Sequence, residues 1–180
     1  MAVLIEGISV VIRVDALTAV FASRQRDFKA LVPNPTLCMD GELARVGFMT
    51  PVGARKFVEV LGREGLHYLK DGKAQDMVVV DQQQGPMAPC DWLVVGHVML
   101  NNGQGPRVTV AALHDSQLTE VVMPADWQFE GSLSQTFAFV PNDKLDSSMQ
   151  FLRQENGMDV YHSTLTGTEM FTVDSRESNG

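Results

Sequence analysis

The sequence lacks any apolar run that approaches the roughly 20 residues needed for a membrane-spanning helix. Its opening stretch, residues 1–14, has no basic region and is interrupted by Glu6 and Arg13, so we expect no secretion leader. Only two cysteines occur, Cys38 and Cys90, and no zinc or iron–sulfur spacing is present. We therefore expect a soluble, cytoplasmic protein with reduced thiols, no metal and no cofactor.

Positive charge is scarce toward the C-terminus. Residues 1–114 hold eleven acidic and eleven basic side chains, whereas residues 115–180 hold eleven acidic and three basic ones, so the last third carries the whole net charge of −8. Nucleic acids and anionic membranes both require clustered lysine and arginine, so we expect neither as a partner. The acidic surface permits a basic protein partner, although solubility alone also explains it.

Motifs of nucleotide and ester chemistry are also absent. No phosphate-cradling glycine loop, nucleophile elbow or Walker-type lysine occurs, so nucleotide-driven chemistry and serine hydrolysis have no support. The four histidines are scattered, and only His114 has an acidic neighbour, Asp115. Adjacent residues of a strand point to opposite faces, so this pair is a poor chelate and no metal site is expected.

What is present is typical of a single globular domain. The chain of 180 residues is 44% hydrophobic and 20% charged, which is long enough and apolar enough for one sizeable core. We expect one domain over residues 1–173, with any subdivision near residues 85–91. Residues 174–180 contain no apolar side chain, so we expect a disordered tail there.

Two helices in the first half have clear sequence signals. An apolar stripe at helical spacing predicts a helix over residues 17–32 that ends at Pro33. Arg24 is the one polar member of the stripe, so a break into two helices at that position is the alternative. A second helix is predicted from Thr50 as N-cap and Pro51 at the first helical position to Gly65 as C-cap. A weaker apolar stripe predicts a third helix in the second half, over residues 143–154.

Alternating or continuous apolar runs predict the strands. They are expected over residues 8–14, 36–39, 42–49, 66–70, 74–81, 93–100, 107–113, 121–123, 136–140, 160–165 and 169–173. Asp40-Gly41 and Asp71-Gly72 are typical of tight hairpin turns. Both faces of residues 93–100 are apolar, so we place that strand in the middle of a sheet and expect it to be covered on both sides.

These patterns predict the α+β class: a mixed, largely antiparallel sheet with two or three helices packed on it. The order strand, helix, strand, strand over residues 43–81 is compatible with a ferredoxin-like or a related split β-α-β arrangement in the first half. Such a likeness of architecture implies no activity.

The least ordinary stretch is Asp81–Trp92, a polar, proline-broken segment between two apolar strand-like runs. Its three consecutive carboxamides are suited either to binding a polar ligand or to bonding the loop's own backbone. Its indole is suited either to a pocket wall or to the core. We predict that this stretch forms the rim of a ligand-binding site through Asp81, Gln82, Gln83, Gln84 and Trp92.

A cysteine-dependent hydrolase or transferase is the alternative interpretation. Its nucleophile is Cys90, with His97 or His114 as the base and Asp91 beside the thiol. The charge of a nearby Asp91 raises rather than lowers a thiol pKa, and a small hydrophobe is the commoner role of cysteine. Asp81 and Asp91 also bracket the loop as an acid–base pair would, but turn formation at strand ends explains both.

Each candidate catalytic group therefore has a simpler structural explanation. The sequence favours a non-catalytic binding protein that recognises a protein partner or a small polar ligand, with the cysteine-dependent enzyme as the alternative. A basic protein or a second copy of the chain is the expected partner, and neither nucleic acid nor membrane is.

Overall fold

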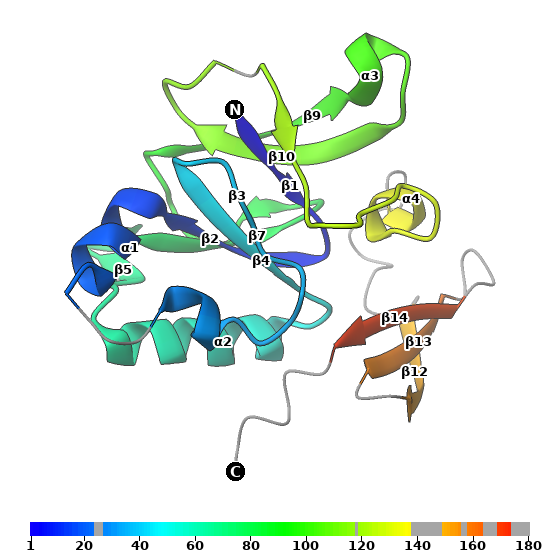
Figure 1. Ribbon diagram of the computed structural model, residues 1–180, viewed down its shortest axis with the longest axis horizontal. Helices are drawn as coiled ribbons and strands as arrows, with labels where there is room; N and C mark the ends of the chain where they lie inside the picture. The colour runs from blue at the N-terminus through cyan, green and yellow to red at the C-terminus, as the bar shows by residue number, and fades with distance from the viewer. Residues whose placement is uncertain (24–26, 118, 138–148, 156–157, 164–168, 174–180) are drawn as a thin grey trace.

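The computed structural model describes residues 1–23, 27–117, 119–137, 149–155, 158–163 and 169–173. These residues form a five-stranded antiparallel sheet, a four-stranded mixed sheet, a three-stranded antiparallel sheet, a two-stranded ribbon and a few helices (Figure 1). The α+β class predicted from the sequence, with mixed and antiparallel pairing, is thus confirmed.

The five-stranded sheet is built around β2 (Ile8–Arg13). Its strands follow the order β3 (Cys38–Met39), β4 (Leu43–Phe48), β2, β7 (Met77–Asp81) and β8 (Gly85–Pro86), and all neighbours are antiparallel. Because β4 and β7 both run antiparallel to β2, they are parallel to each other, and α2 (Pro51–Glu64) connects them. These elements form a split β-α-β unit. A ferredoxin-like arrangement, which interleaves two such units in one sheet, is not shown.

The bounds of α2 follow its local sequence. The Thr50 hydroxyl accepts a hydrogen bond of 3.2 Å from the N–H of Gly53, and Pro51 occupies the first turn, where its missing N–H costs nothing. Gly65 ends the helix in the left-handed conformation, with φ of 114°. The predicted N-cap and C-cap are both confirmed.

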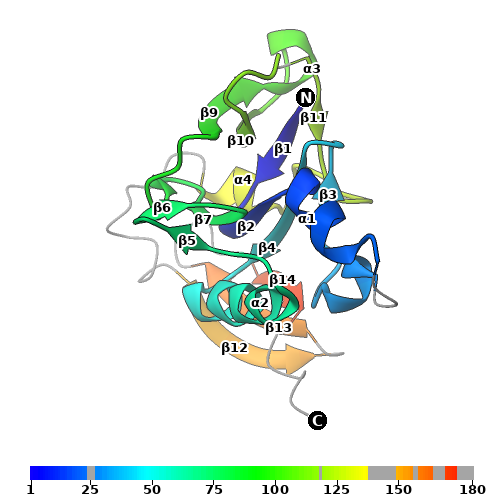
Figure 2. The same cartoon turned by 90° about the vertical axis from the view of Figure 1, so that its left-hand side faces the viewer.

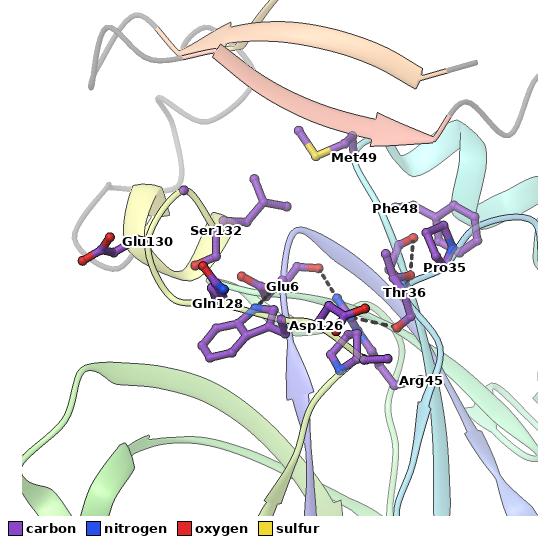
Figure 3. Close-up of a pocket in the computed structure, with 16 residues that line it drawn as sticks. Glu6, Pro35, Thr36, Arg45, Phe48, Met49, Asp126, Gln128, Glu130 and Ser132 are labelled. Atoms are coloured by element: carbon purple, nitrogen blue, oxygen red, sulfur yellow. Dashed lines mark hydrogen bonds between the residues drawn. The ribbon is translucent and has the colours of Figure 1, made fainter. Parts of the chain in front are cut away.

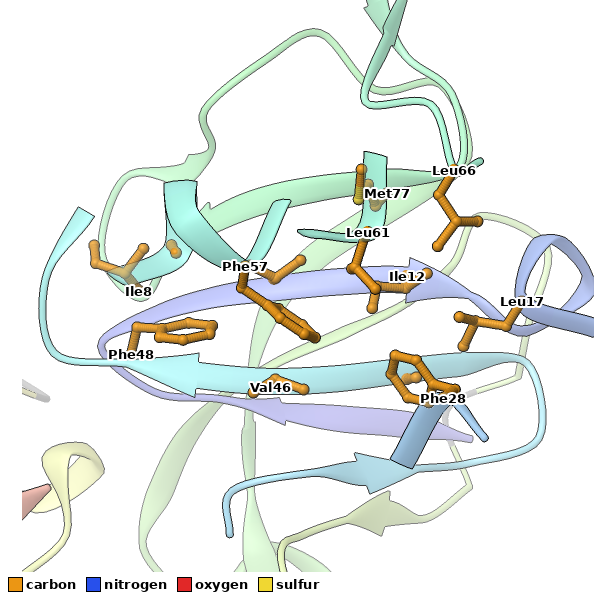
Figure 4. Packing of buried hydrophobic residues seen from close by; sticks show 13 residues of the cluster. Ile8, Ile12, Leu17, Phe28, Val46, Phe48, Phe57, Leu61, Leu66 and Met77 are labelled. Atoms are coloured by element: carbon orange, nitrogen blue, oxygen red, sulfur yellow. The ribbon is translucent and has the colours of Figure 1, made fainter. Parts of the chain in front are cut away.

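The first core lies between the helices and the five-stranded sheet (Figure 4). α2 contributes Phe57 and Leu61, while α1 (Val14–Phe21) and the 3-10 helix η1 (Phe28–Leu31) contribute Leu17 and Phe28. Each large apolar side chain buried in this way contributes about 1.5–3 kcal/mol. The helix predicted over residues 17–32 is divided into α1 and η1, in line with the break predicted near Arg24, and residues 24–26 between them lie outside the described residues.

The second core lies between the two larger sheets. The four-stranded sheet has the order β11 (Val121–Val122), β1 (Ala2–Ile5), β10 (Arg107–Leu113) and β9 (Leu93–Met99), and β1 is parallel to β11 but antiparallel to β10. Apolar residues of β1, β9 and β10 pack against those of β2, β4 and β7. In Figure 2, α2 is seen nearly end-on, with the five-stranded sheet above it and β9 and β10 farther from the helix. The strand β1 was not predicted from the sequence.

The position of β9 differs from the prediction. It lies at the edge of the four-stranded sheet and not in its middle, and Val94 and Met99 are 45% and 55% exposed. The interior place beside β10 is taken by β1, which pairs Leu4 with Val110. An apolar pattern on both faces does not reveal which neighbour a strand will have. The predicted hairpin partner β10 is confirmed, and α3 (Leu100–Gly103) forms the turn between them.

The outer face of the four-stranded sheet is covered by the chain that follows β11. Trp127 and Phe129 pack on a cluster that contains Leu4, Val108 and Val110. Their two rings meet edge to face, with centroids 6.5 Å apart. This covering segment also supplies one wall of the pocket described below.

The later elements show two corrections. Residues 133–137 form the short helix α4 (Leu133–Phe137), not the strand expected from residue 136, and the remainder of that prediction lies outside the described residues. Residues 149–155 form the strand β12 (Met149–Glu155), not the second half of a helix over 143–154. The predicted last hairpin is confirmed as β13 (Met158–Ser163) and β14 (Glu169–Val173).

Two further sequence predictions concern turns and membranes. The turn Asp71-Gly72 joins β5 (Leu69–Lys70) to β6 (Lys73–Ala74), and Asp40-Gly41 joins β3 to β4, as predicted.

No helix in the described part of the chain is long and apolar enough to cross a membrane. The tail predicted over residues 174–180 lies outside the described residues.

Candidate functional site

A pocket of about 420 Å³ opens where β1 and β4 end beneath the covering segment (Figure 3). We call it the Arg45 pocket. Its apolar lining includes Phe48, Met49 and Leu133, and the indole of Trp127 also lines it. Its polar lining consists of Glu6, Thr36, Arg45, Asp126, Gln128, Glu130 and Ser132.

Arg45 is the most deeply buried charged residue of this pocket, with 2% of its surface exposed. It lies on the face of β4 that points away from α2, so the alternation of the strand turns it toward the four-stranded sheet. Its Nε donates to the hydroxyl of Ser9 at 2.9 Å, and its Nη2 donates to the main-chain carbonyl of Glu6 at 2.9 Å. A third bond of 3.3 Å runs from Nη1 to the carbonyl of Thr36.

The guanidinium has room only because residue 47 is glycine. A Cβ atom placed on Gly47 would lie 2.9 Å from the Cζ of Arg45, which is closer than real contacts allow. The loop before β3 anchors the same glycine: the Thr36 hydroxyl accepts from its N–H at 2.7 Å, and the Asn34 amide donates to its carbonyl at 2.8 Å. Gly47 therefore lets Arg45 lie flat along the end of the strand.

Glu6 connects the floor of the pocket to its covering wall. Its carboxylate accepts hydrogen bonds from the indole N–H of Trp127 at 2.7 Å and from the main-chain N–H of Ser134 at 2.6 Å. The residue is only 8% exposed, so both bonds form away from bulk water. Bonds to an ionised acceptor are stronger than neutral ones. The carboxylate thus holds residues 127–134 over the end of β1.

The electrostatics of the Arg45 pocket follow from this burial. Burial lowers the pKa of Arg45, while the neighbouring Cys38 and Glu6 raise it. The pKa of Cys38 is raised, mainly by burial and against the opposing charge of Arg45. An arginine stays protonated in proteins, so the site presents a fixed positive charge that is largely shielded from water.

Gln82 is the one residue of the predicted rim that reaches this region. It is 5% exposed, its carboxamide oxygen accepts from the N–H of Gly7 at 2.9 Å, and its amide donates to the carbonyl of Leu133 at 3.4 Å. Gly7 has φ of 57°, and a Cβ there would lie 2.7 Å from the carbonyl oxygen of Phe48. The Gln82 side chain thus binds protein backbone on both sides of the pocket wall.

Asp81, Gln83 and Gln84 of the predicted rim form a tight turn after β7, whereas Trp92 lies elsewhere. The Asp81 carboxylate accepts from the N–H groups of Gln83 and Gln84 at 2.8 and 2.9 Å. The indole of Trp92 donates to the carbonyl of Ala74 at 3.1 Å and packs at the border of the second core. The structure does not bring Asp81, Gln83, Gln84 and Trp92 together in one pocket.

Trp92 lies instead in a second depression of about 570 Å³, which we call the Trp92 hollow. Ionic side chains gather around it: the Arg13 guanidinium lies 6.0 Å from the indole ring, and Lys73 pairs with Asp91 at 2.8 Å. The His114 ring contacts Asp115 at 3.2 Å. Both members of the Lys73–Asp91 pair are more than half exposed, so the pair contributes little to stability.

The residues of the cysteine-dependent alternative are placed without a catalytic pairing. Within the described residues, no hydrogen bond joins Cys90 to a histidine. Burial raises the pKa of the Cys90 thiol, against the lowering effect of the N–H groups of Trp92 and Leu93. His97 faces Thr109 at 3.1 Å, and its pKa is lowered by partial burial and by the charge of Arg107. This arrangement does not favour a thiolate nucleophile, and the enzyme stays an untested prediction.

Sequence reasoning missed Glu6, Thr36 and Arg45, which define the Arg45 pocket together with Trp127. One signal was present: Arg45 interrupts the apolar strand 43–48, and a glycine follows two positions later on the same face. Among the residues that the structure describes, no group of three or more His, Cys, Asp or Glu side chains could hold a metal ion.

The chain was compared with protein families, curated proteins and solved structures. No family model, curated protein or solved structure matches the chain.

Proposed function

We propose that the protein is a non-catalytic binding protein that takes a small polar ligand in the Arg45 pocket. The observation that carries the proposal is a guanidinium 2% exposed that lines a pocket of about 420 Å³. Ligand sites in proteins typically measure about 300–1,000 Å³ and combine mostly apolar walls with a few polar groups. The indole of Trp127 and the side chains of Met49 and Leu133 supply such walls.

Arg45 has donors to offer a ligand. Each of its two terminal nitrogens carries two N–H groups, and each donates a single hydrogen bond to the described part of the chain. One N–H on each terminal nitrogen therefore has no partner in that part of the protein. A ligand carbonyl or carboxylate would satisfy them, and a carboxylate matches the planar guanidinium in geometry and charge.

The rim limits the charge of the ligand. Asp126 and Glu130 line the pocket as exposed carboxylates, and Glu6 adds a buried one. Like charges repel, so a multiply charged anion such as a phosphate ester is disfavoured. The pocket best fits a small amphipathic molecule with one carbonyl or carboxylate group directed at Arg45.

Ligand-observed NMR with a set of small monocarboxylates and primary amides tests the proposal. We expect some of these compounds to bind wild-type protein and to lose at least about tenfold in affinity when M49W fills the pocket. The matched control is M87W, because Met87 is 53% exposed and lines neither the Arg45 pocket nor the Trp92 hollow. Equal binding to wild type and M49W, or no binder among either compound class, would contradict the proposal.

A further inference from the structure

The strand β9 differs from every other edge strand of the two packed sheets. β3, β8 and β11 at the remaining three edges are two residues long each, whereas β9 is seven residues long. Short edges and edge prolines protect sheets from pairing with other chains, and so do charged side chains. β9 contains no proline and no Asp, Glu, Lys or Arg. Figure 2 shows it on the outer side of its sheet.

Within the part of the chain that the structure describes, nothing requires a glycine at Gly96, the centre of β9. Its φ is not among the positive values, and a Cβ placed on it would have no heavy atom within 4 Å. A glycine in the interior of a strand weakens the strand and often marks a place where another backbone approaches closely. Val94 and Met99 on the same strand are exposed apolar side chains, which also indicates that another chain contacts β9.

We propose that β9 pairs with β9 of a second copy of this chain, antiparallel and with a two-fold axis at Gly96. Three residues lie on each side of this glycine within the strand, so the register is self-complementary. Val94 then lies opposite Val98 of the second copy, and Leu93 lies opposite its Met99. The two four-stranded sheets become one continuous sheet, and the unpaired backbone groups of both edges form hydrogen bonds.

Charge favours a second copy in this direction. The whole chain has a net charge of −8, so repulsion between two copies is smallest where the surfaces that meet carry no charge, as on β9. Arg107 pairs with Met99 at the far end of β9, and Asp91 precedes its first residue. An antiparallel pair places Arg107 at the same end as Asp91 of the second copy, whereas a parallel pair places like charges together.

Light scattering during size-exclusion chromatography tests the existence of the pair. We expect twice the mass of 19.8 kDa for the wild type, and at least about tenfold weaker association for V94K, which adds a charge to the edge. V52K is the matched control, because Val52 is 57% exposed on α2, away from β9. A wild type that stays monomeric at about 100 μM, a concentration at which weak pairs form, overturns the proposal. A dimer that V94K leaves intact also overturns it.

Oxidative cross-linking tests the register in a C90S background, in which Cys38 is buried. A disulfide requires Cβ atoms about 3.5–4.5 Å apart, so G96C alone should form a disulfide-linked dimer across the axis. V94C alone should not, because its counterpart lies about four residues along the antiparallel partner, but V94C combined with V98C should. Equal cross-linking by V94C and G96C would indicate a parallel pair and would overturn the antiparallel register. Circular dichroism confirms that each variant is folded.

Discussion

The Arg45 pocket and the Trp92 hollow use charged side chains in opposite ways. In the pocket, Arg45 is 2% exposed and bonded to Ser9 and to two main-chain carbonyls. Asp91, which lines the hollow, is 72% exposed, and its partner Lys73 is 57% exposed. Water screens the exposed pair, but nothing screens a buried charge that loses its partners. The Trp92 hollow therefore brings charged side chains together without burying them, whereas the Arg45 pocket holds a charged side chain in place by burial and hydrogen bonds.

The largest expected difference between the two regions is in their response to the loss of a cation, Arg45 in the pocket or Lys73 beside the hollow. We expect R45M to reduce the free energy of unfolding by about 3 kcal/mol, because the two main-chain carbonyls and the Ser9 hydroxyl lose their donor while buried and the buried Glu6 carboxylate loses a nearby positive charge. We expect K73M to be indistinguishable from wild type, because Lys73 is exposed. Urea denaturation measures both. Equal effects of the two substitutions would show that burial does not distinguish the regions.

A smaller effect concerns the space that holds Arg45. We expect G47A to lower the free energy of unfolding by about 1–3 kcal/mol, because the new methyl group displaces the guanidinium. Gly62 in α2 has no heavy atom within 4 Å of its Cβ position, so G62A should instead stabilise the protein by about 0.5–1 kcal/mol. Thermal and urea unfolding give both values. The two substitutions should change the free energy of unfolding in opposite directions. A G47A variant as stable as wild type would mean that Arg45 is not held in place.

The smallest expected effect concerns Cys90, which precedes Asp91 of the hollow in the sequence. Because burial raises the pKa of Cys90, less thiolate is present at a given pH than in free cysteine. We expect a thiol reagent at neutral pH to label Cys90 more slowly than free cysteine, with a rate that continues to rise at higher pH. C90S isolates buried Cys38, which should react only on unfolding. Rapid labelling of Cys90 at neutral pH would revive the cysteine-dependent enzyme.

Local signals allowed part of the fold to be predicted. Thr50, Pro51 and Gly65 determined α2 because caps act within a single helical turn, and Asp-Gly pairs determined two hairpins for the same reason. Prediction failed where pairing with another segment determines the secondary structure. Residues 149–155 have a helical apolar spacing, but they pair with β13 as a strand. Ladder pairing between distant segments overrides such a local preference.

The candidate site was less predictable than the fold. Asp81–Trp92 attracted attention because it concentrates polar and reactive residue types, yet Asp81 caps a turn and Gln82 binds backbone. Arg45 looked ordinary because it is one charge in an apolar strand. Its partners Ser9 and Glu6 are 36 and 39 residues away in the sequence, so no local pattern joins them to it.

The sequence by itself determined the α+β class, the caps of α2 and the hairpin turns, because these depend on propensities and bonds within a few residues. Only the tertiary structure decided that β1 displaces β9 from the interior of its sheet and that Arg45 faces Glu6 beneath Trp127. Those outcomes depend on which faces pack together across more than a hundred residues. Hydrophobic burial drives such packing without direction, and the complete set of contacts selects one arrangement.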